Sequence, residues 1–301
     1  MTNHETDQEL FYKEAFQRNA GILNHSQQEK IRNATVAIAG LGGVGGFHTE
    51  TLARTGFTKF HIADFDTFDI VNFNRQESAT METIGRKKVD VVRDLIHSIN
   101  PHASVTCFEE GVTVSNIDDF LKGVDVVLDG LDFFALDIRR VLFRNAYQKG
   151  IYVVTAAPVG YGAAVMTFPP VGTTFDSYMD LNDSLDEQDR QLHFGLGLTP
   201  SLLQASYYKP ETINWKKGKH LAPSLGVGVL LAANLAVTET IKIVIDELEK
   251  VTFIPSSLHF DPYVRKVKKV WVPFGNKNPI QKCKFMIAKF LIKRKKDYNC
   301  L

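Results

Sequence analysis

The fold of this chain is decided by the stretch from Val36 to Gln76, which reads VAIAGLGGVGGFHTETLARTGFTKFHIADFDTFDIVNFNRQ. Its first residues, 36–39, form a short apolar run of the kind that fills a buried parallel strand. Glycines follow in the order G-x-G-x-x-G, and a helix is expected from about Val44 to Thr55, with Gly56 as its C-terminal stop. The stretch therefore predicts a strand, a tight turn and a helix, the repeating unit of an α/β sheet.

Each glycine of this turn has its own physical role. Gly40 allows the tight turn, Gly42 lets a phosphate approach the backbone, and Gly45 lets the helix pack against the strand. From Gly43 onward, the free amide groups and the positive end of the helix dipole would face that phosphate. A second apolar strand ends at Asp64, about where a carboxylate takes up ribose hydroxyls. These features predict a bound nucleotide, and they suit NAD as well as ATP.

The end of the stretch is more specific than its glycines. It carries the pattern DFD…N-x-x-RQ, formed by Asp64, Asp66, Asn72, Arg75 and Gln76. This arrangement resembles the ThiF/MoeB/HesA superfamily, whose best-known members activate ubiquitin and ubiquitin-like proteins. The resemblance implies a Rossmann-like sheet that binds ATP through these residues, with Asp64 on the ribose and Arg75 on the phosphates. An NAD(P)-binding oxidoreductase is the alternative, because it also explains the glycines and Asp64.

Two further charged residues match the superfamily. Lys88 stands at a G-x-x-K position, in the first turn of a helix expected to end near Ile99. The helix dipole disfavours a cation there by ~0.3–1 kcal/mol, which a bound triphosphate would offset. Asp132 follows an expected strand at 124–128, and the resemblance makes it the Mg²⁺ ligand required for adenylation. The structural alternatives are an exposed lysine at a helix start and a helix N-cap aspartate.

The N-terminal segment, 1–34, is polar and expected to be a helical arm. In the superfamily such an arm carries an arginine that reaches into the ATP site of the partner subunit, and Arg18 resembles that residue. A solvated arginine on a helix face is the alternative. The resemblance thus implies a homodimer, with much of its interface formed by the long apolar helix expected at Leu225–Leu248, which we expect to be buried.

The resemblance covers Arg18 to Ile245 and sets the expected domains. After the arm, an ATP-binding and adenylation domain is expected at 35–260, and a basic strand and tail at 261–301. The predicted fold class is α/β: a Rossmann-like, doubly wound, mainly parallel sheet with helices on both faces and C-terminal strands. Residues 169–222, rich in Asp, Ser, Pro and Gly, correspond to the long crossover loop that covers the acyl substrate.

Cysteine usage departs from many relatives. The crossover loop has no cysteine and the zinc-binding C-x-x-C pairs are missing, since the three cysteines are Cys107, Cys283 and Cys300. We therefore expect no thioester and no zinc site, we interpret Cys107 as an inert core thiol, and we assign no metal to His193 or His220.

Composition bears on DNA binding and on the cellular location of the protein. The formal net charge is +1 and charged residues make up 23%, so nothing in the overall charge draws the chain to DNA. We expect a cytoplasmic protein, because residues 1–20 do not form a secretory signal and we expect no apolar run long enough to span a bilayer.

The C-terminal region is strongly basic. Val264 to Lys296 holds twelve Lys or Arg and no Asp or Glu. Its last part, KCKFMIAKFLIKRKK, is expected to form a basic helix in which Phe285, Met286, Phe290 and Leu291 are partly grouped. Such a helix can lie on an anionic membrane surface, and a partner-docking or merely solvated tail is the alternative.

The predicted function is an ATP-dependent adenylyltransferase that activates a carboxylate as an acyl-adenylate and releases pyrophosphate. Both reactants are anionic, so positioned cations must neutralise them. The resemblance assigns this role to Arg75, Lys88 and an Arg18 from the other subunit, with Mg²⁺ on Asp132. The acyl substrate stays open among a ubiquitin-like protein or peptide C-terminus, a small acid and a modified tRNA base. A non-catalytic ThiF-like partner protein is a further alternative.

Overall fold

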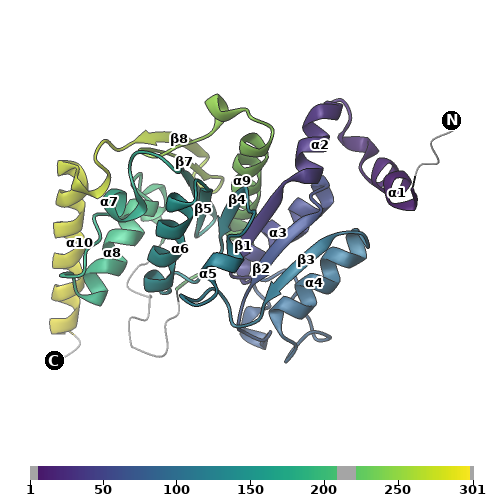
Figure 1. Ribbon diagram of the computed structural model, residues 1–301. Coiled ribbons are helices and arrows are strands. Elements are labelled where there is room, and N and C mark those ends of the chain that lie inside the picture. Colours follow the sequence, from purple (N-terminus) through teal and green to yellow (C-terminus); the bar gives the residue numbers. More distant parts are fainter. Residues whose placement is uncertain (1–5, 209–221, 299–301) are drawn as a thin grey trace. The chain divides into compact units, whose positions relative to one another are not determined.

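A computed structural model describes residues 6–208 and 222–298, with side chains up to residue 292 (Figure 1). The chain divides into two compact units. The first comprises Met1–Leu131 and Ala233–Val251, and the second comprises Asp132–Ala232 and Thr252–Leu301.

The first unit is built on four parallel strands. In spatial order β3-β2-β1-β4, they are β3 (Ser104–Phe108), β2 (Lys59–Ala63), β1 (Thr35–Ala39) and β4 (Val126–Asp129). Strand β1 is flanked on both sides, since Ile38 pairs with Ile62 of β2 and with Leu128 of β4. Residues 36–39 are therefore completely buried, which explains why this run is apolar on both faces.

Two helices of the first unit precede β1, and the others follow strands. They are α1 (Asp7–Ala15), α2 (His25–Asn33), α3 (Gly43–Thr55), α4 (Lys88–Ile99) and α5 (Ile117–Phe120), with short 3₁₀ turns η1 (Gln17–Asn19), η2 (Ile70–Asn72) and η5 (Leu248–Lys250). Helix α3 contacts both α4 and β1, and α4 contacts β3 (Figure 1). Helix α3 ends at Gly56, whose φ of 104° requires glycine. Tyr12 donates a hydrogen bond to the Gly56 carbonyl and so ties α1 to this end of α3.

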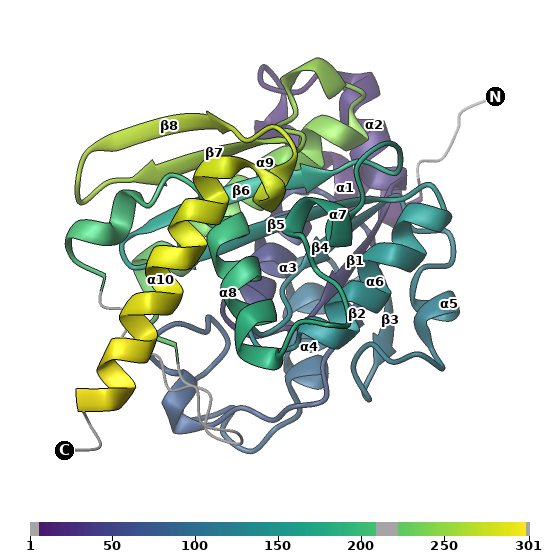
Figure 2. The ribbon, with the colours of Figure 1, turned by 90° about the vertical axis from the view of Figure 1, so that its left-hand side faces the viewer.

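The second unit has antiparallel strands. In order, they are β5 (Tyr152–Val159), β6 (Gly162–Phe168), β7 (Ser256–Asp261) and β8 (Lys266–Trp271). Its helices are α6 (Leu136–Gln148), α7 (Phe175–Met179), α8 (Glu187–Leu198) and α10 (Pro279–Tyr298), with 3₁₀ turns η3 (Leu203–Ser206) and η6 (Gly275–Lys277). Figure 2 shows α10 lying along α8. The predicted α/β class is confirmed. The strands are parallel in the first unit and antiparallel in the second, so the strand arrangement of the chain is mixed.

The apolar helix near the C-terminal third corrects two predictions. Helix α9 spans Gly226–Val244, close to the predicted bounds, but it is not buried on every side: Val227 is 60% exposed and Leu230 43%. Its length and hydropathy also meet the criteria for a membrane span, so the prediction that no apolar run is long enough was wrong. A core helix passes the same test, and 56% of the most apolar window is buried.

Two further expectations change. Cys107 is half-buried on β3, an outer strand of the parallel set, because that strand has a neighbour on one side among the described residues. Its thiol is therefore not a core thiol, although burial still raises its pKa. The predicted crossover loop is not uniformly irregular, since α7, α8 and η3 lie in its described part. His220 lies outside the described residues.

Candidate nucleotide site

The glycine turn after β1 is packed against the end of β4. Gly40 has a φ of 87°, and a Cβ there would lie 2.5 Å from the Gly130 carbonyl oxygen. A Cβ on Gly45 would lie 1.8 Å from the Gly40 carbonyl oxygen. Gly42 differs, because the nearest atom to its Cβ would be Nε2 of Gln76 at 3.6 Å. Gly40 and Gly45 thus serve close backbone packing, and Gly42 leaves the turn open to a ligand.

Gly130 follows β4 and packs against this turn, a contact that was not predicted from the sequence. A Cβ on it would lie 2.6 Å from the Gly40 carbonyl oxygen, so it must also be glycine. A glycine directly after a buried strand, as Gly130 follows Asp129, was the available signal.

Asp64 fastens the glycine turn to the end of β2. Its Oδ2 accepts a hydrogen bond from the Leu41 amide at 2.6 Å, and its Oδ1 accepts one from the Asp66 amide at 2.8 Å. Burial raises the pKa of the Asp64 carboxyl group, and the positive charge of Lys88 opposes that rise. Each carboxylate oxygen can accept a further hydrogen bond, so holding the turn and binding a ribose are compatible roles.

Lys88 is the first residue of α4 and is 5% exposed. Its Nζ lies 3.0 Å from Oδ2 of Asp66, and its amide donates to the Asp66 carbonyl. Lys87 provides a contrast, since its side chain is 57% exposed and pairs with Glu109 at the surface. The exposed-lysine alternative is therefore wrong for Lys88. The Asp66 carboxylate partly offsets the positive charge of Lys88, which the helix dipole disfavours at this helix start. The Asp66 side chain itself is 53% exposed.

The loop between β2 and α4 holds the remaining predicted residues of this unit. Asn72 is buried, and its Oδ1 accepts the amide of Asp69 in a capping box around η2. Arg75 donates to the Val71 carbonyl and to Oδ1 of Asn74, both within the loop.

Gln76 lies beside the glycine turn with one polar atom unsatisfied. Its side chain is buried, its Nε2 is the atom nearest the open side of Gly42, and its Oε1 has no hydrogen-bond partner among the described residues. A buried side-chain amide with an unpaired atom is costly unless a ligand satisfies it. Its position therefore fits a nucleotide held over the turn.

Asp132 belongs to the second unit and follows β4 by three residues. Its Oδ1 accepts the Phe134 amide at 2.9 Å, but the N-cap of α6 is Ala135. The N-cap alternative was therefore wrong. No cluster of three His, Cys, Asp or Glu suited to a metal occurs in the described residues. A single exposed carboxylate suits Mg²⁺ held mainly by phosphate oxygens and water.

Arg18 lies at the wrong end of α3 to serve the glycine turn of its own chain. It is exposed in η1, and the adjoining Asn19 donates to the Thr55 carbonyl at the C-terminal end of α3. The glycine turn is at the N-terminal end of this helix, roughly 20 Å away at 1.5 Å per residue. The structure thus brings together the glycine turn, Asp64, Asp66, Lys88 and Gln76, and it does not bring Arg18 to them.

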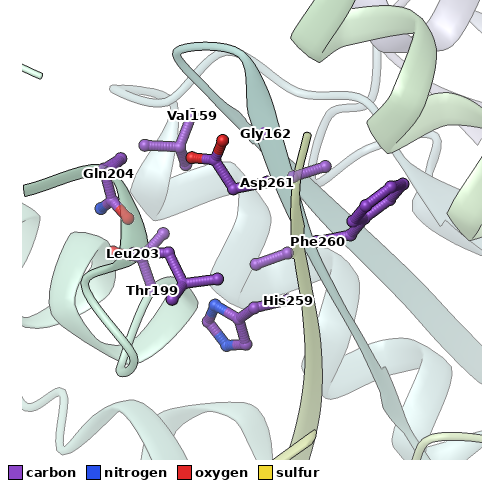
Figure 3. A pocket seen from close by; sticks show the side chains of 10 residues that line it. Val159, Gly162, Thr199, Leu203, Gln204, His259, Phe260 and Asp261 are labelled. Atoms are coloured by element: carbon purple, nitrogen blue, oxygen red, sulfur yellow. The ribbon is translucent and has the colours of Figure 1, made fainter. Parts of the chain in front are cut away.

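A separate small cavity of about 10 Å³ lies in the second unit, between η3 and β7 (Figure 3). Thr199, Gln204, His259 and Asp261 contribute to its lining. His259 is buried between two hydroxyl groups, with its ring nitrogens 2.8 Å from Oγ of Ser201 and of Ser257. Sites for ligands of drug size are generally ~300–1,000 Å³, so this cavity is too small for a nucleotide.

The chain is similar in sequence to known enzymes over about half of its length. The chain is 34% identical over 155 residues to tRNA threonylcarbamoyladenosine dehydratase of Bacillus subtilis, covering 51% of this chain and 59% of that protein. It is 33% identical over 138 residues to molybdopterin-synthase adenylyltransferase of Salmonella typhimurium, covering 46% and 52%. The chain thus spans little more than half the length of these relatives.

A solved structure extends the fold comparison. Escherichia coli MccB with ATP superposes with a TM-score of 0.58 at 17% identity, covering 85% of this chain and 69% of that one, which shows a shared fold. The model of the ThiF family matches residues 16–283. Because this match covers most of the chain, the protein belongs to the ThiF family.

Proposed function

We propose that this protein is an ATP-dependent adenylyltransferase that activates a carboxylate. The observation that carries the proposal is the network at the open glycine turn: Asp64 holds the turn, Asp66 pairs with the buried Lys88, and Gln76 offers an unpaired amide atom. A hydride-transferring enzyme would use the glycines and Asp64 but has no task for a buried cation at this place.

The chemistry needs few groups. A substrate carboxylate attacks the α-phosphorus of ATP, one oxygen–phosphorus bond forms, and pyrophosphate leaves. Lys88 and Arg75 would hold phosphate oxygens, the amides at the start of α3 would donate hydrogen bonds, and Asp64 would accept a ribose hydroxyl. Mg²⁺ held on Asp132 would neutralise charge on the phosphates. Positioning and electrostatics suffice, and no general base is required because the attacking carboxylate is already ionised.

The reactions named for the two relatives can share one first step, the formation of an adenylate. An adenylyltransferase makes the acyl-adenylate, and a dehydratase can use the same intermediate, because the carboxylate oxygen that leaves with AMP is the oxygen that would otherwise leave as water. We therefore propose a carboxylate carried on a macromolecule as the substrate, with tRNA bearing a threonylcarbamoyl group and a protein C-terminus as the two tests. We also propose that the protein acts in the cytoplasm as a homodimer.

Lys88 and Lys87 give a matched test of the site. Lys88→Met keeps the bulk of the buried side chain and removes its charge, whereas Lys87→Met removes a neighbouring surface charge. Losing a charge-assisted contact of about 1.5–3 kcal/mol should weaken ATP·Mg²⁺ binding ~10–100-fold in Lys88→Met. Lys87→Met should bind as the unaltered protein does. Isothermal titration calorimetry measures both.

The same titration separates the alternatives. Tight binding of NAD without binding of ATP would refute the adenylyltransferase and favour the oxidoreductase. Equal ATP affinity in the two variants would place the nucleotide elsewhere. Binding of ATP without any exchange of labelled pyrophosphate, in the presence of each of the two substrates, would favour the non-catalytic partner protein.

A further inference from the structure

The C-terminal helix α10 has one face that is fixed against the second unit. Gln281 is 3% exposed and donates to the Leu196 carbonyl oxygen at 3.3 Å. The Phe285 ring lies 4.4 Å from the His193 ring of α8. Figure 2 shows the helix beside α8, which it contacts. These contacts determine which side of α10 faces the protein.

The opposite side of α10 is apolar and exposed. We call it the outer face, and its members are Ile280, Cys283, Met286, Ile287, Phe290 and Leu291. They recur at intervals of three and four residues, so they lie on one side of a helix. The five large side chains other than the cysteine are 55–67% exposed. Phe285 was predicted to belong to this group, but it lies on the packed face, where its ring contacts His193.

The charged residues on the part of α10 whose side chains are described are all basic. Between Pro279 and Ile292 there are three lysines and no acidic residue. Lys289 is paired with Asp189 at 2.6 Å, whereas Lys282 is exposed and has no acidic partner among the described residues. Strand β8 adds cations: burial lowers the pKa of Lys284, and the positive charge of Lys268 on β8 lowers it further.

We propose that the outer face of α10 docks on an anionic lipid bilayer, with its apolar side chains at the boundary of the acyl chains and its lysines among the head groups. An anionic bilayer offers an apolar interior to the exposed apolar side chains and negative head groups to the lysines. A second copy of the chain fits poorly. Two such faces packed together would bring Lys282 of each copy near the other copy's lysines, with no carboxylate on the described part of the helix between them.

The test is flotation of the full-length protein with lipid vesicles. Vesicles of phosphatidylcholine alone are compared with vesicles in which roughly a third of the lipid is phosphatidylserine, at low and high salt. The protein should float with the anionic vesicles, and high salt should weaken the binding. Phe290→Asp should weaken it at least about tenfold, because a buried aromatic ring is lost and a repelled charge is added. Val171→Asp, at a side chain 69% exposed outside α10, is the matched control and should not.

Charge is tested separately. Lys282→Ala should weaken binding about fivefold, as expected for one lysine near an anionic surface, while Lys122→Ala should not. A Phe290→Trp variant should still bind, and lipids brominated in the acyl chains should quench its added fluorescence. Absence of flotation, equal flotation with neutral vesicles, or normal flotation of Phe290→Asp would each overturn the proposal. Sedimentation velocity in which Phe290→Asp dissociates a dimer, without vesicle binding by either protein, would assign the face to a second copy instead.

Discussion

At the scale of single residues, the glycine turn of the first unit is surrounded by polar groups with little or no exposure. Lys88 and Asp64 are ionisable groups in a largely apolar setting, and each is held by specific partners, Asp66 and the amide of Leu41. Buried charges persist when they are paired, because an unpaired one would be costly. The charge network at the glycine turn is therefore preformed in the protein itself.

His48 is a buried residue without such partners, and it makes stability depend on pH. It lies in α3, is completely buried, and neither ring nitrogen has a hydrogen-bond partner among the described residues. Burial lowers the pKa of His48 to about 3. The folded protein therefore keeps this ring neutral, while the unfolded chain takes up a proton below about pH 6.5. Because the unfolded state binds more protons, stability is lost as the pH falls from about 6.5 toward 3.

The prediction is that His48→Leu flattens this dependence. Between pH 7 and pH 5 the unaltered protein should lose roughly 2 kcal/mol through His48, from ~1.5 pH units at ~1.36 kcal/mol each. His259, whose pKa burial lowers to about 4, contributes in the same direction in both proteins. Urea unfolding at the two pH values measures the difference. An identical loss in both proteins would show that His48 is protonated, or partnered, in the folded state.

At the scale of elements, the start of α3 is packed closely against the glycine turn. Neighbouring glycines of this helix allow a matched comparison. A Cβ on Gly45 would lie 1.8 Å from the Gly40 carbonyl oxygen, whereas the nearest atom to a Cβ on Gly46 would be the Leu41 carbonyl oxygen at 3.9 Å.

Gly45→Ala should therefore displace the glycine turn, while Gly46→Ala should not. We expect Gly45→Ala to lower the free energy of unfolding by at least about 2 kcal/mol and to abolish ATP binding, because the overlap is with backbone. Gly46→Ala should raise it by ~0.5–1 kcal/mol, the usual gain of alanine over glycine inside a helix. Urea unfolding and calorimetry measure both quantities. Similar behaviour of the two variants would contradict the packing of Gly45 on the turn.

At the scale of the whole molecule, the position of Arg18 bears on assembly. The arginine stands by the C-terminal end of α3, and the glycine turn is at the other end. Arg18 can therefore contribute to a nucleotide site only in another copy of the chain. The exposed side chains on α9, Val227 and Leu230, are available for such an assembly.

The corresponding prediction is complementation in a two-fold dimer. Arg18→Ala and Asp132→Ala homodimers should each be nearly inactive in pyrophosphate exchange, since one charge contact is typically worth ~10²–10³ in rate. After subunit exchange, a mixed dimer has one site with both defects and one with neither, so activity should return. If mixing restores nothing although the subunits exchange, Arg18 does not act across a dimer.

The sequence by itself determined the parallel α/β unit and the location of its glycine turn. Apolar runs at buried strands, a glycine turn and the stop at Gly56 are local signals, and each depends on backbone conformation or on burial of a few neighbouring residues. The charged residues near the turn were also found from sequence, although their roles at the site remain predictions.

Only the tertiary structure decided what those residues contact and which surfaces stay exposed. Three contacts arise because segments distant in sequence meet in space. Lys88 is buried against Asp66, Gly130 packs on the glycine turn, and Arg18 lies at the far end of α3. The same holds for α10, where periodicity predicts a helix but the contact of Phe285 with His193 selects the face that is covered. The side-chain pattern predicts whether a segment forms a helix or a strand. Which face of that helix or strand is buried depends on the elements that pack against it in the fold.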